Sequence, residues 1–229
     1  GKIKTVGKPT DRFREDYSRL LRALRFSCQL DFTIEPETFV AIKNLAKRLN
    51  DKNAKGDRVV PVETISKEML KAFYHNPVKA FDLYDQTGAF KSLMPELLKM
   101  KGCPQPTKYH TEGDVWEHTR LALQQLTTKS YQKHFGSDKP HPQTIMAVMF
   151  HDIAKPATLK TPEKDGTDRI RFDEHNTKGA SMVRKICERL KMASPASYGV
   201  NTEEIEWLIK HHLILVHSQV DSLNHTTIE

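Results

Sequence analysis

The sequence predicts an all-α fold, and three observations support that prediction. Apolar residues recur at three- and four-residue spacing over long stretches, which is the periodicity of one helix face. Only 10 glycines occur in 229 residues, which argues against a sheet-rich fold. Hydrophobic residues make up 38% of the chain and charged residues 28%, a balance typical of a globular protein with a real core.

The first half of the chain divides into five expected helices. After a short irregular lead, Asp11 can cap a helix that runs through Phe26. Pro36 stands in the first turn of the second helix, a position that proline favours. Gly88 ends the fourth helix, and the polar stretch 50–58 is expected to be a loop. The expected helices cover residues 11–26, 35–49, 62–74, 77–87 and 92–98.

A glycine- and proline-containing linker over 99–107 separates this half from the second. The segment Asp114–Glu117 has the pattern of a capping box, so a helix is expected from there to about residue 126. Trp116 and Trp207 are expected to be core aromatics. Loops are expected at 129–142 and 156–172, the second with room for a small hairpin. Helices are expected at 143–154, 176–192 and 202–212.

Charge and cysteine content restrict the cellular setting and the partners. The net charge of +7 and the pI of about 9.2 favour an anionic partner such as nucleic acid or a nucleotide. The three cysteines are too far apart for a disulfide frame and are expected to be reduced, buried thiols of a cytoplasmic protein. No apolar run approaches membrane-spanning length and no signal peptide is visible, so no membrane partner is expected.

The first expected helix carries a charged face. Glu15, Arg19, Arg22 and Phe26 fall on one side of it, with Asp16 beside them. One interpretation is a solvated surface helix in which Glu15 and Arg19 form an i,i+4 ion pair. The other is nucleotide recognition, because a carboxylate and a guanidinium together can match the hydrogen-bonding edge of a base.

A family resemblance bears on this choice. The segments Arg12–Asp16 and Arg19–Phe26 resemble the neck region of class II tRNA nucleotidyltransferases and bacterial poly(A) polymerases, which have an EDxxR motif. The segments 30–38 and 65–71 are similar as well. The resemblance implies that Asp16 and Arg19 read the base of CTP or ATP, that Glu15 orients Arg19, and that Arg22 belongs to the same nucleotide-binding face. Tyr17–Ser18 stands where the family usually has Pro-Leu.

The catalytic head domain of that family is expected to be missing. The head precedes the neck and uses a Gly-Ser loop and paired carboxylates to hold two Mg²⁺ ions for phosphoryl transfer. The sequence contains no such pattern. The chain alone is therefore not expected to add nucleotides.

A histidine and aspartate constellation marks the second half. His151 and Asp152 are adjacent at the end of the apolar helix, where both can face one cation. Such mixed ligation favours Mn²⁺, Fe, Ni²⁺, Co²⁺ or Zn²⁺ over Ca²⁺. The plainer interpretation of the dipeptide alone is a helix C-terminal histidine beside a capping aspartate.

The wider pattern resembles the HD phosphohydrolase superfamily. His118, His151–Asp152, His175 and His211–His212 follow its order H…HD…H…HH. The resemblance implies that His118, His151 and Asp152 bind a metal, that His175 and His212 bind a second metal or the phosphate, and that Lys155 holds the phosphate. The superfamily also has a later aspartate ligand. Asp221 is the only late candidate for it, but its spacing is too short, so this aspartate ligand is expected beyond Glu229. His110 is expected to shape the rim of the site, and His211 is a less favoured ligand than His212.

We therefore expect two parts. Residues 1–105 would form a neck and body region that contacts tRNA or other RNA and nucleotides, and residues 106–229 a C-terminally truncated HD domain. The parent would be a CCA-adding enzyme or poly(A) polymerase, and its specificity among CCA, CC, A and poly(A) addition stays open. Two alternatives remain: a non-catalytic RNA-binding module with a relict, metal-free HD fold, and a stand-alone HD phosphohydrolase.

Overall fold

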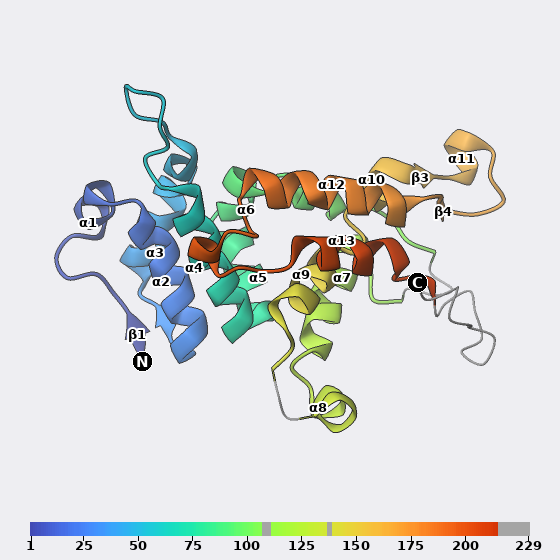
Figure 1. The fold of residues 1–229 in the computed structure, drawn as a ribbon, viewed down its shortest axis with the longest axis horizontal. Helices are drawn as coiled ribbons and strands as arrows, with labels where there is room; N and C mark the ends of the chain where they lie inside the picture. The colour runs from blue at the N-terminus through green and yellow to red at the C-terminus, as the bar shows by residue number, and fades with distance from the viewer. Residues whose placement is uncertain (107–110, 137–138, 215–229) are drawn as a thin grey trace.

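The computed structural model describes residues 1–106, 111–136 and 139–214. Helices dominate these residues and the strands form only two short two-stranded sheets, which confirms the predicted all-α class. The helices of the first 75 residues lie at one end of an elongated molecule, and the segment 159–172 projects from the other end (Figure 1). None of the described helices combines the length and apolar character that a membrane crossing requires.

The first expected helix is interrupted, and the prediction of one continuous helix over 11–26 was wrong. Helix α1 spans Pro9–Glu15 and α2 spans Ser18–Leu30. Between them Asp16 is extended, with φ −156° and ψ 105°, and its Oδ1 accepts a hydrogen bond of 2.9 Å from the Ser18 amide. The carboxylate competes with helical hydrogen bonding, as Asp side chains often do, and so starts a new helix.

The remaining helices of the first half follow the expected order. The side chain of Glu35 accepts from the Thr38 amide and caps the helix after it, and Gly88 adopts φ 77° where the fourth expected helix has ended. Strand β1 pairs in parallel with β2. The elements are β1 Lys2–Ile3, β2 Thr33–Ile34, α3 Pro36–Leu45, the 3₁₀ helix η1 Ala46–Asn50, α4 Val62–His75 and α5 Pro77–Gln86.

The prediction of a single helix at 92–98 was wrong, because two shorter elements share this stretch. Helix α6 covers Ala89–Leu93 and the 3₁₀ helix η2 covers Leu97–Met100. Met94 between them has φ −142° and ψ 62°. Proline disfavours the helical conformation of the residue before it, so Pro95 accounts for this break.

The second half contains short helices in both expected loops: α8 Lys129–Phe135 in the loop at 129–142, and α10 Lys155–Thr158 and α11 Pro162–Asp165 in the loop at 156–172. Thr128 caps α8 by accepting from the Tyr131 amide. Helix α8 has no buried residue, so it lacks the apolar periodicity that would have revealed it. The other elements are α7 Val115–Gln125, α9 Pro142–Phe150, β3 Leu159–Lys160, β4 Arg171–Phe172, α12 His175–Arg189, η3 Pro195–Ser197 and α13 Thr202–His211.

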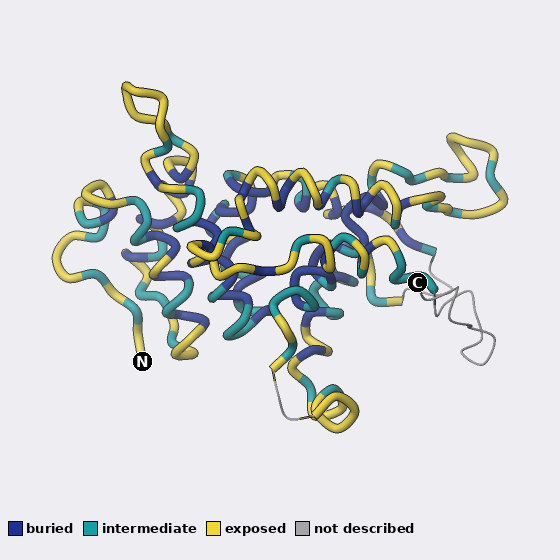
Figure 2. The backbone as a smooth tube through the Cα atoms, in the orientation of Figure 1, coloured by how far each residue is buried: buried dark blue, intermediate teal, exposed yellow. Residues whose placement is uncertain are grey.

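The two halves share one continuous hydrophobic core, seen as buried backbone running through both (Figure 2). Ser66 on α4 donates a buried hydrogen bond to the Leu190 carbonyl, and Arg189 pairs with both carboxylate oxygens of Glu96. Trp116 packs on Phe81 with ring centroids 4.3 Å apart, as a core aromatic should. The expectation for Trp207 was wrong: 42% of it is exposed, on the outer side of α13.

The cysteines are buried and unpaired, as expected. Burial raises the pKa of Cys28 and Cys187 to about 12 and that of Cys103 to about 11. Thiolate is the reactive form, so we expect all three thiols of the native protein to resist an aromatic disulfide reagent at pH 8 and to react at once in denaturant. A thiol that reacts rapidly in the folded protein would contradict this burial.

Candidate metal centre

Four elements bring imidazoles to one carboxylate. His118 lies in the first turn of α7, His151 and Asp152 directly follow α9, His175 is the first residue of α12, and His212 directly follows α13. His175 and His212 meet because α12 and α13 pack together. His118 and His151 join them because α9 lies against both α7 and α13. All the sequence-predicted metal ligands therefore meet.

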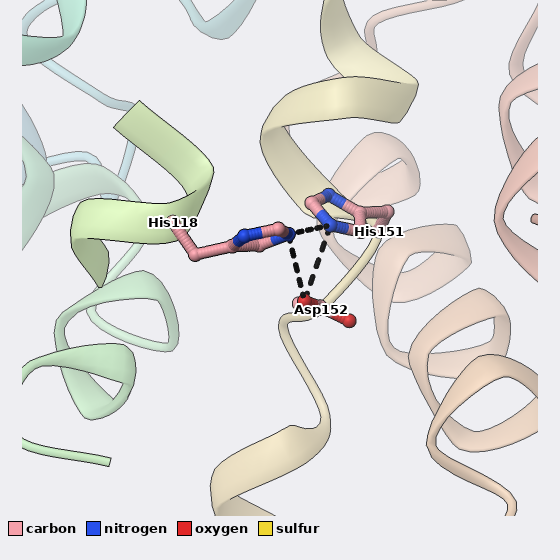
Figure 3. Close-up of side chains that lie close together, drawn as sticks. All are labelled: His118, His151 and Asp152. Atoms are coloured by element: carbon pink, nitrogen blue, oxygen red, sulfur yellow. Dashed lines mark hydrogen bonds and ion pairs between the residues drawn. The ribbon is translucent and has the colours of Figure 1, made fainter. Parts of the chain in front are cut away.

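Asp152 is the hub of this cluster, and it is only 1% exposed. Its Oδ2 lies 3.1 Å from the Nε2 atom of His151 and 3.7 Å from that of His118, and these three side chains converge in Figure 3. Its Oδ1 lies 3.4 Å from the Nε2 atom of His175 and 3.8 Å from that of His212. The carboxylate thus serves two ligand groups, one on each oxygen, and each is compact enough to hold an ion.

The ring orientations are fixed by contacts at the other nitrogen. Nδ1 lies 2.8 Å from the Val148 carbonyl in His151, 2.7 Å from the Phe172 carbonyl in His175 and 2.7 Å from the Ile209 carbonyl in His212. The Nδ1 of His118 lies 2.6 Å from Oε1 of Glu112. An oxygen acceptor requires a proton on Nδ1, so each neutral ring presents its Nε2 lone pair to the centre. Metal-binding histidines have this arrangement.

The residues present fit a divalent metal. Both oxygens of Asp152 are buried and neither has a well-formed hydrogen bond, although the Lys155 ammonium lies 2.8 Å from Oδ2 as an ion pair. Two Nε2 atoms, of His118 and His151, lie 3.3 Å apart, as do those of His175 and His212. Two lone pairs facing each other are unfavourable without a proton or a cation between them. Imidazole and carboxylate donors suit a transition metal or Mn²⁺.

The electrostatics keep most ligands in the state that a metal needs. Burial lowers the pKa of His118, and it lowers that of His212 to about 4, so both are neutral at pH 7. Burial opposes ionisation of Asp152, but His151, His175 and Lys155 outweigh it and hold the pKa of Asp152 well below its usual value. For His151 burial is outweighed by Asp152, so its pKa is raised. His151 is therefore protonated more readily than the other two as the pH falls.

The predicted nucleotide-binding residues lie at the α1–α2 junction. Arg19 Nη1 donates to Glu15 Oε2 at 2.6 Å and to the Arg12 carbonyl at 2.9 Å, which fits an orienting role for Glu15. Asp16 is exposed and its Oδ2 is 4.0 Å from Arg19 Nε. Arg22 is exposed, one turn further along α2. Of the four predicted residues, Glu15, Asp16 and Arg22 are exposed and Arg19 is half-buried, and a helix break separates Glu15 from Arg19.

Comparison with known proteins covers both halves. The model of the family described as "Probable RNA and SrmB- binding site of polymerase A" matches residues 31–101, and the HD domain model matches residues 115–221. The chain is 33% identical to the Multifunctional CCA protein of Alkalilimnicola ehrlichii over 183 residues, which are 78% of this chain and 39% of that protein. Multifunctional CCA proteins of Mannheimia succiniciproducens and Pasteurella multocida are 32% and 33% identical, over 83% and 79% of this chain and 43% and 40% of their own lengths.

The chain belongs to the tRNA nucleotidyltransferase and poly(A) polymerase family. It spans about two fifths of the length of the curated relatives it matches. The HD centre described above falls within the part of the chain that the HD domain model matches.

Several histidines of this family member have no part in the centre. His211 is turned away, with Nδ1 2.8 Å from the Trp207 carbonyl and its ring on the Trp207 ring. His134 is exposed on α8, while His75 and His141 lie elsewhere on the surface of the fold. The positions His110, His217, Asp221, His225 and 226–229 lie outside the described residues.

Two residues were missed by the sequence interpretation. Glu112 was given no role, and Gln105 lies in the expected linker. Gln105 is buried and its Oε1 accepts a 2.7 Å hydrogen bond from Lys155. A glutamate in a polar loop and a glutamine between two prolines carry no periodic signal, so only their position in the fold identifies them.

Replacing Glu112 with glutamine is expected to lower the affinity for Ni²⁺ or Mn²⁺ by about 10–100-fold, the usual effect of removing a carboxylate that orients a metal-binding histidine. The physical reason is the loss of the charged acceptor at His118 Nδ1. Calorimetric titration measures it. Glu117→Gln on α7, where the carboxylate is exposed and faces Arg120, is the matched control and should bind the metal normally. Equal affinities in all three proteins would contradict the role of Glu112.

Proposed function

We propose that the HD centre of this chain binds divalent metal and hydrolyses phosphate esters of nucleotides or RNA ends, as a phosphatase or a 2′,3′-cyclic phosphodiesterase. The observation that supports this most is the cluster of four Nε2 lone pairs around the buried Asp152 carboxylate. In this proposal His118, His151 and Asp152 hold one ion, and Asp152, His175 and His212 hold a second ion or face the phosphate. Ni²⁺, Mn²⁺, Co²⁺, Fe and Zn²⁺ all fit the donor set.

The charges of the site favour an anionic substrate. Asp152 and Lys155 neutralise each other, and the four imidazoles add no charge while their Nε2 atoms serve as ligands. A bound divalent ion therefore leaves the buried centre positive, a state that a phosphate ester can balance. Such an ion supplies polarisation of a phosphoryl oxygen and a lowered pKa for a water. The chain's own residues hold the geometry: the carbonyls behind His151, His175 and His212 fix their rings.

The hydrolase proposal is tested by metal analysis together with activity. Purified protein is assayed for bound metal and for release of phosphate from p-nitrophenyl phosphate and of nucleotide from 2′,3′-cyclic AMP, with Ni²⁺, Mn²⁺ or Co²⁺. We expect turnover that His151→Ala removes. Absence of metal and of turnover, with His151→Ala indistinguishable from the wild type, would reject the proposal.

The remaining proposal concerns the first half. We propose that residues 1–105 form the RNA- and nucleotide-contacting neck and body, with Glu15, Asp16, Arg19 and Arg22 at the nucleotide face, and that residues 106–229 form the HD domain. In the full-length parent, nucleotides such as CTP and ATP would meet this face, and a head domain would carry Mg²⁺. The net charge of +7 supports an RNA partner.

Salt dependence tests the RNA proposal. The affinity of the chain for tRNA should fall steeply as salt rises, because each neutralised phosphate releases counterions. An Arg19→Ala and Arg22→Ala double variant should lower the steepness if these residues touch RNA. If they face the nucleotide instead, only nucleotide binding changes. A chain that binds no tRNA at low salt would reject an RNA role for this half.

One observation favours the alternative of a relict, non-catalytic HD fold. Lys155 already neutralises Asp152 at 2.8 Å, so the carboxylate has a cation partner without a metal. In that case the protein would contain no metal and the centre would only support the RNA-binding half. The metal analysis described above separates the two functions directly.

A further inference from the structure

A buried amide, that of Gln105, lies beside the HD centre. It belongs to the segment between residue 101, where the first family-model match ends, and residue 115, where the HD domain match begins. Gln105 is 4% exposed, and its Oε1 accepts a hydrogen bond of 2.7 Å from Nζ of Lys155. The same Nζ lies 2.8 Å from Oδ2 of Asp152. The Lys155 ammonium therefore links the amide to the carboxylate at the middle of the centre.

The amide is only half satisfied. Lys155 carries donors alone, so it contacts the carbonyl oxygen of Gln105 and cannot satisfy the NH₂ group beside it. That Nε2 is buried and has no hydrogen-bond partner among the residues that the structure describes. Leaving a buried donor unpaired destabilises the folded state, and such a group in a folded protein calls for an explanation. A ligand that accepts hydrogen bonds supplies one.

The position of Lys155 is equally constrained. Its side chain is buried, and its ammonium touches Asp152 and Gln105 and lies 5.1 Å from the centre of the Phe172 ring. Gln105 thus holds the ammonium through a contact additional to that of Asp152, and its own N–H donors lie next to it. An ammonium and an amide donor side by side suit an anionic oxygen, and phosphoryl oxygens accept several hydrogen bonds at once.

We propose that Gln105 is a phosphate-binding residue of the HD centre, which donates from Nε2 to a phosphoryl oxygen and holds Lys155 in place for the same oxygen. The inference rests on the proposed phosphohydrolase function, and it assigns the recognition of the substrate's phosphate to a residue of the connecting segment. It also ties the first half of the chain to the HD centre, because the segment continues directly from η2.

Two substitutions separate the two roles of the amide. Gln105→Glu keeps an oxygen that can accept from Lys155 but removes the donor, and Gln105→Leu removes both. The probe is inorganic phosphate, titrated into Mn²⁺-loaded protein by calorimetry, and Mn²⁺ affinity is measured separately. A hydrogen bond to a charged group contributes about 1.5–3 kcal/mol, so both variants should bind phosphate about 10–100-fold more weakly. Mn²⁺ affinity should stay within about threefold in each variant.

The control is the same pair of substitutions at Gln124, which is exposed on α7. Both control variants should bind phosphate like the wild type. Unchanged phosphate affinity in Gln105→Glu would overturn the donor role. A parallel loss of Mn²⁺ and phosphate affinity in both variants would overturn the inference in favour of a merely structural amide. A wild type that binds Mn²⁺ and phosphate but hydrolyses no phosphate ester would reject the proposed hydrolase and leave this inference standing.

Discussion

Replacement of Asp152 with asparagine is expected to abolish binding of the divalent metal and to lower phosphohydrolase turnover by about a thousandfold. Asp152 is the only carboxylate shared by both ligand groups in the described part of the chain, so both lose their anionic ligand at once. Loss of the several kcal/mol that a metal contributes to charge stabilisation corresponds to about three factors of ten in rate. Metal content and turnover measured on the same sample test this.

The comparison needs a variant that excludes simple misfolding. Asp152→Glu keeps the charge that neutralises Lys155 and moves the carboxylate by one methylene, so it should fold and bind the metal weakly. Asp173→Asn is the matched surface control, because Asp173 is exposed and pairs with Lys160. It should retain metal and turnover. Full activity in Asp152→Asn would remove the carboxylate from the proposed chemistry.

Glu68→Ala is expected to lower the free energy of unfolding by about 3–5 kcal/mol, the cost of leaving a buried charge without its partner. Glu68 on α4 accepts a 2.6 Å hydrogen bond from Nε of Arg25 on α2, and the two side chains are only 9% and 12% exposed. The pair connects two extensively packed helices. Urea unfolding followed by circular dichroism measures the change.

Glu63→Ala is a stringent control for this prediction. Glu63 lies on the same helix and also pairs with a cation, Lys191, but that cation is exposed. Exposed ion pairs contribute little to stability, so its unfolding midpoint should move far less. Equal shifts for the two variants would mean that burial does not decide the strength of these pairs.

Lowering the pH is expected to weaken the binding of divalent metal. A proton and a metal compete for the same Nε2 lone pair. The pKa of His151 is raised, so its folded form keeps a proton that the metal must displace as the pH falls, whereas the low pKa of His212 keeps that ring available down to about pH 4. Apparent affinity for Mn²⁺ should therefore weaken with falling pH, first through His151. Affinity that is constant from pH 8 to pH 5 would contradict this.

The helices that bury an apolar face could be predicted from the sequence. Helices α4 and α5 lie close to their expected positions because their apolar spacing reflects real burial against the core. The same reasoning failed for α8, which has no fully buried residue, and at Asp16, where one side-chain hydrogen bond outweighs helix propensity. Trp207 was wrongly predicted to lie in the core, because the residue type alone does not show whether a large aromatic side chain faces the core or solvent.

The metal ligands of the candidate site could be predicted from the sequence, but the residues that hold His118 and Lys155 in place could not. His118, His151, Asp152, His175 and His212 stand in a recognisable order along the chain, so a family pattern was enough to group them. Glu112 and Gln105 act through single contacts made across loops, at 2.6 Å and 2.7 Å. Such contacts depend on where residues 105 and 112 lie relative to α10 and α7, which no local pattern encodes.

Anomalous diffraction from crystals soaked in Mn²⁺ or Ni²⁺ shows directly whether Nε2 atoms from separate helices and the Asp152 carboxylate together bind a cation. We predict an anomalous peak at about 2.0–2.2 Å from ligand atoms of His118, His151 and Asp152. An empty centre in well-ordered crystals, with the added ion bound only at exposed acidic side chains, would contradict it.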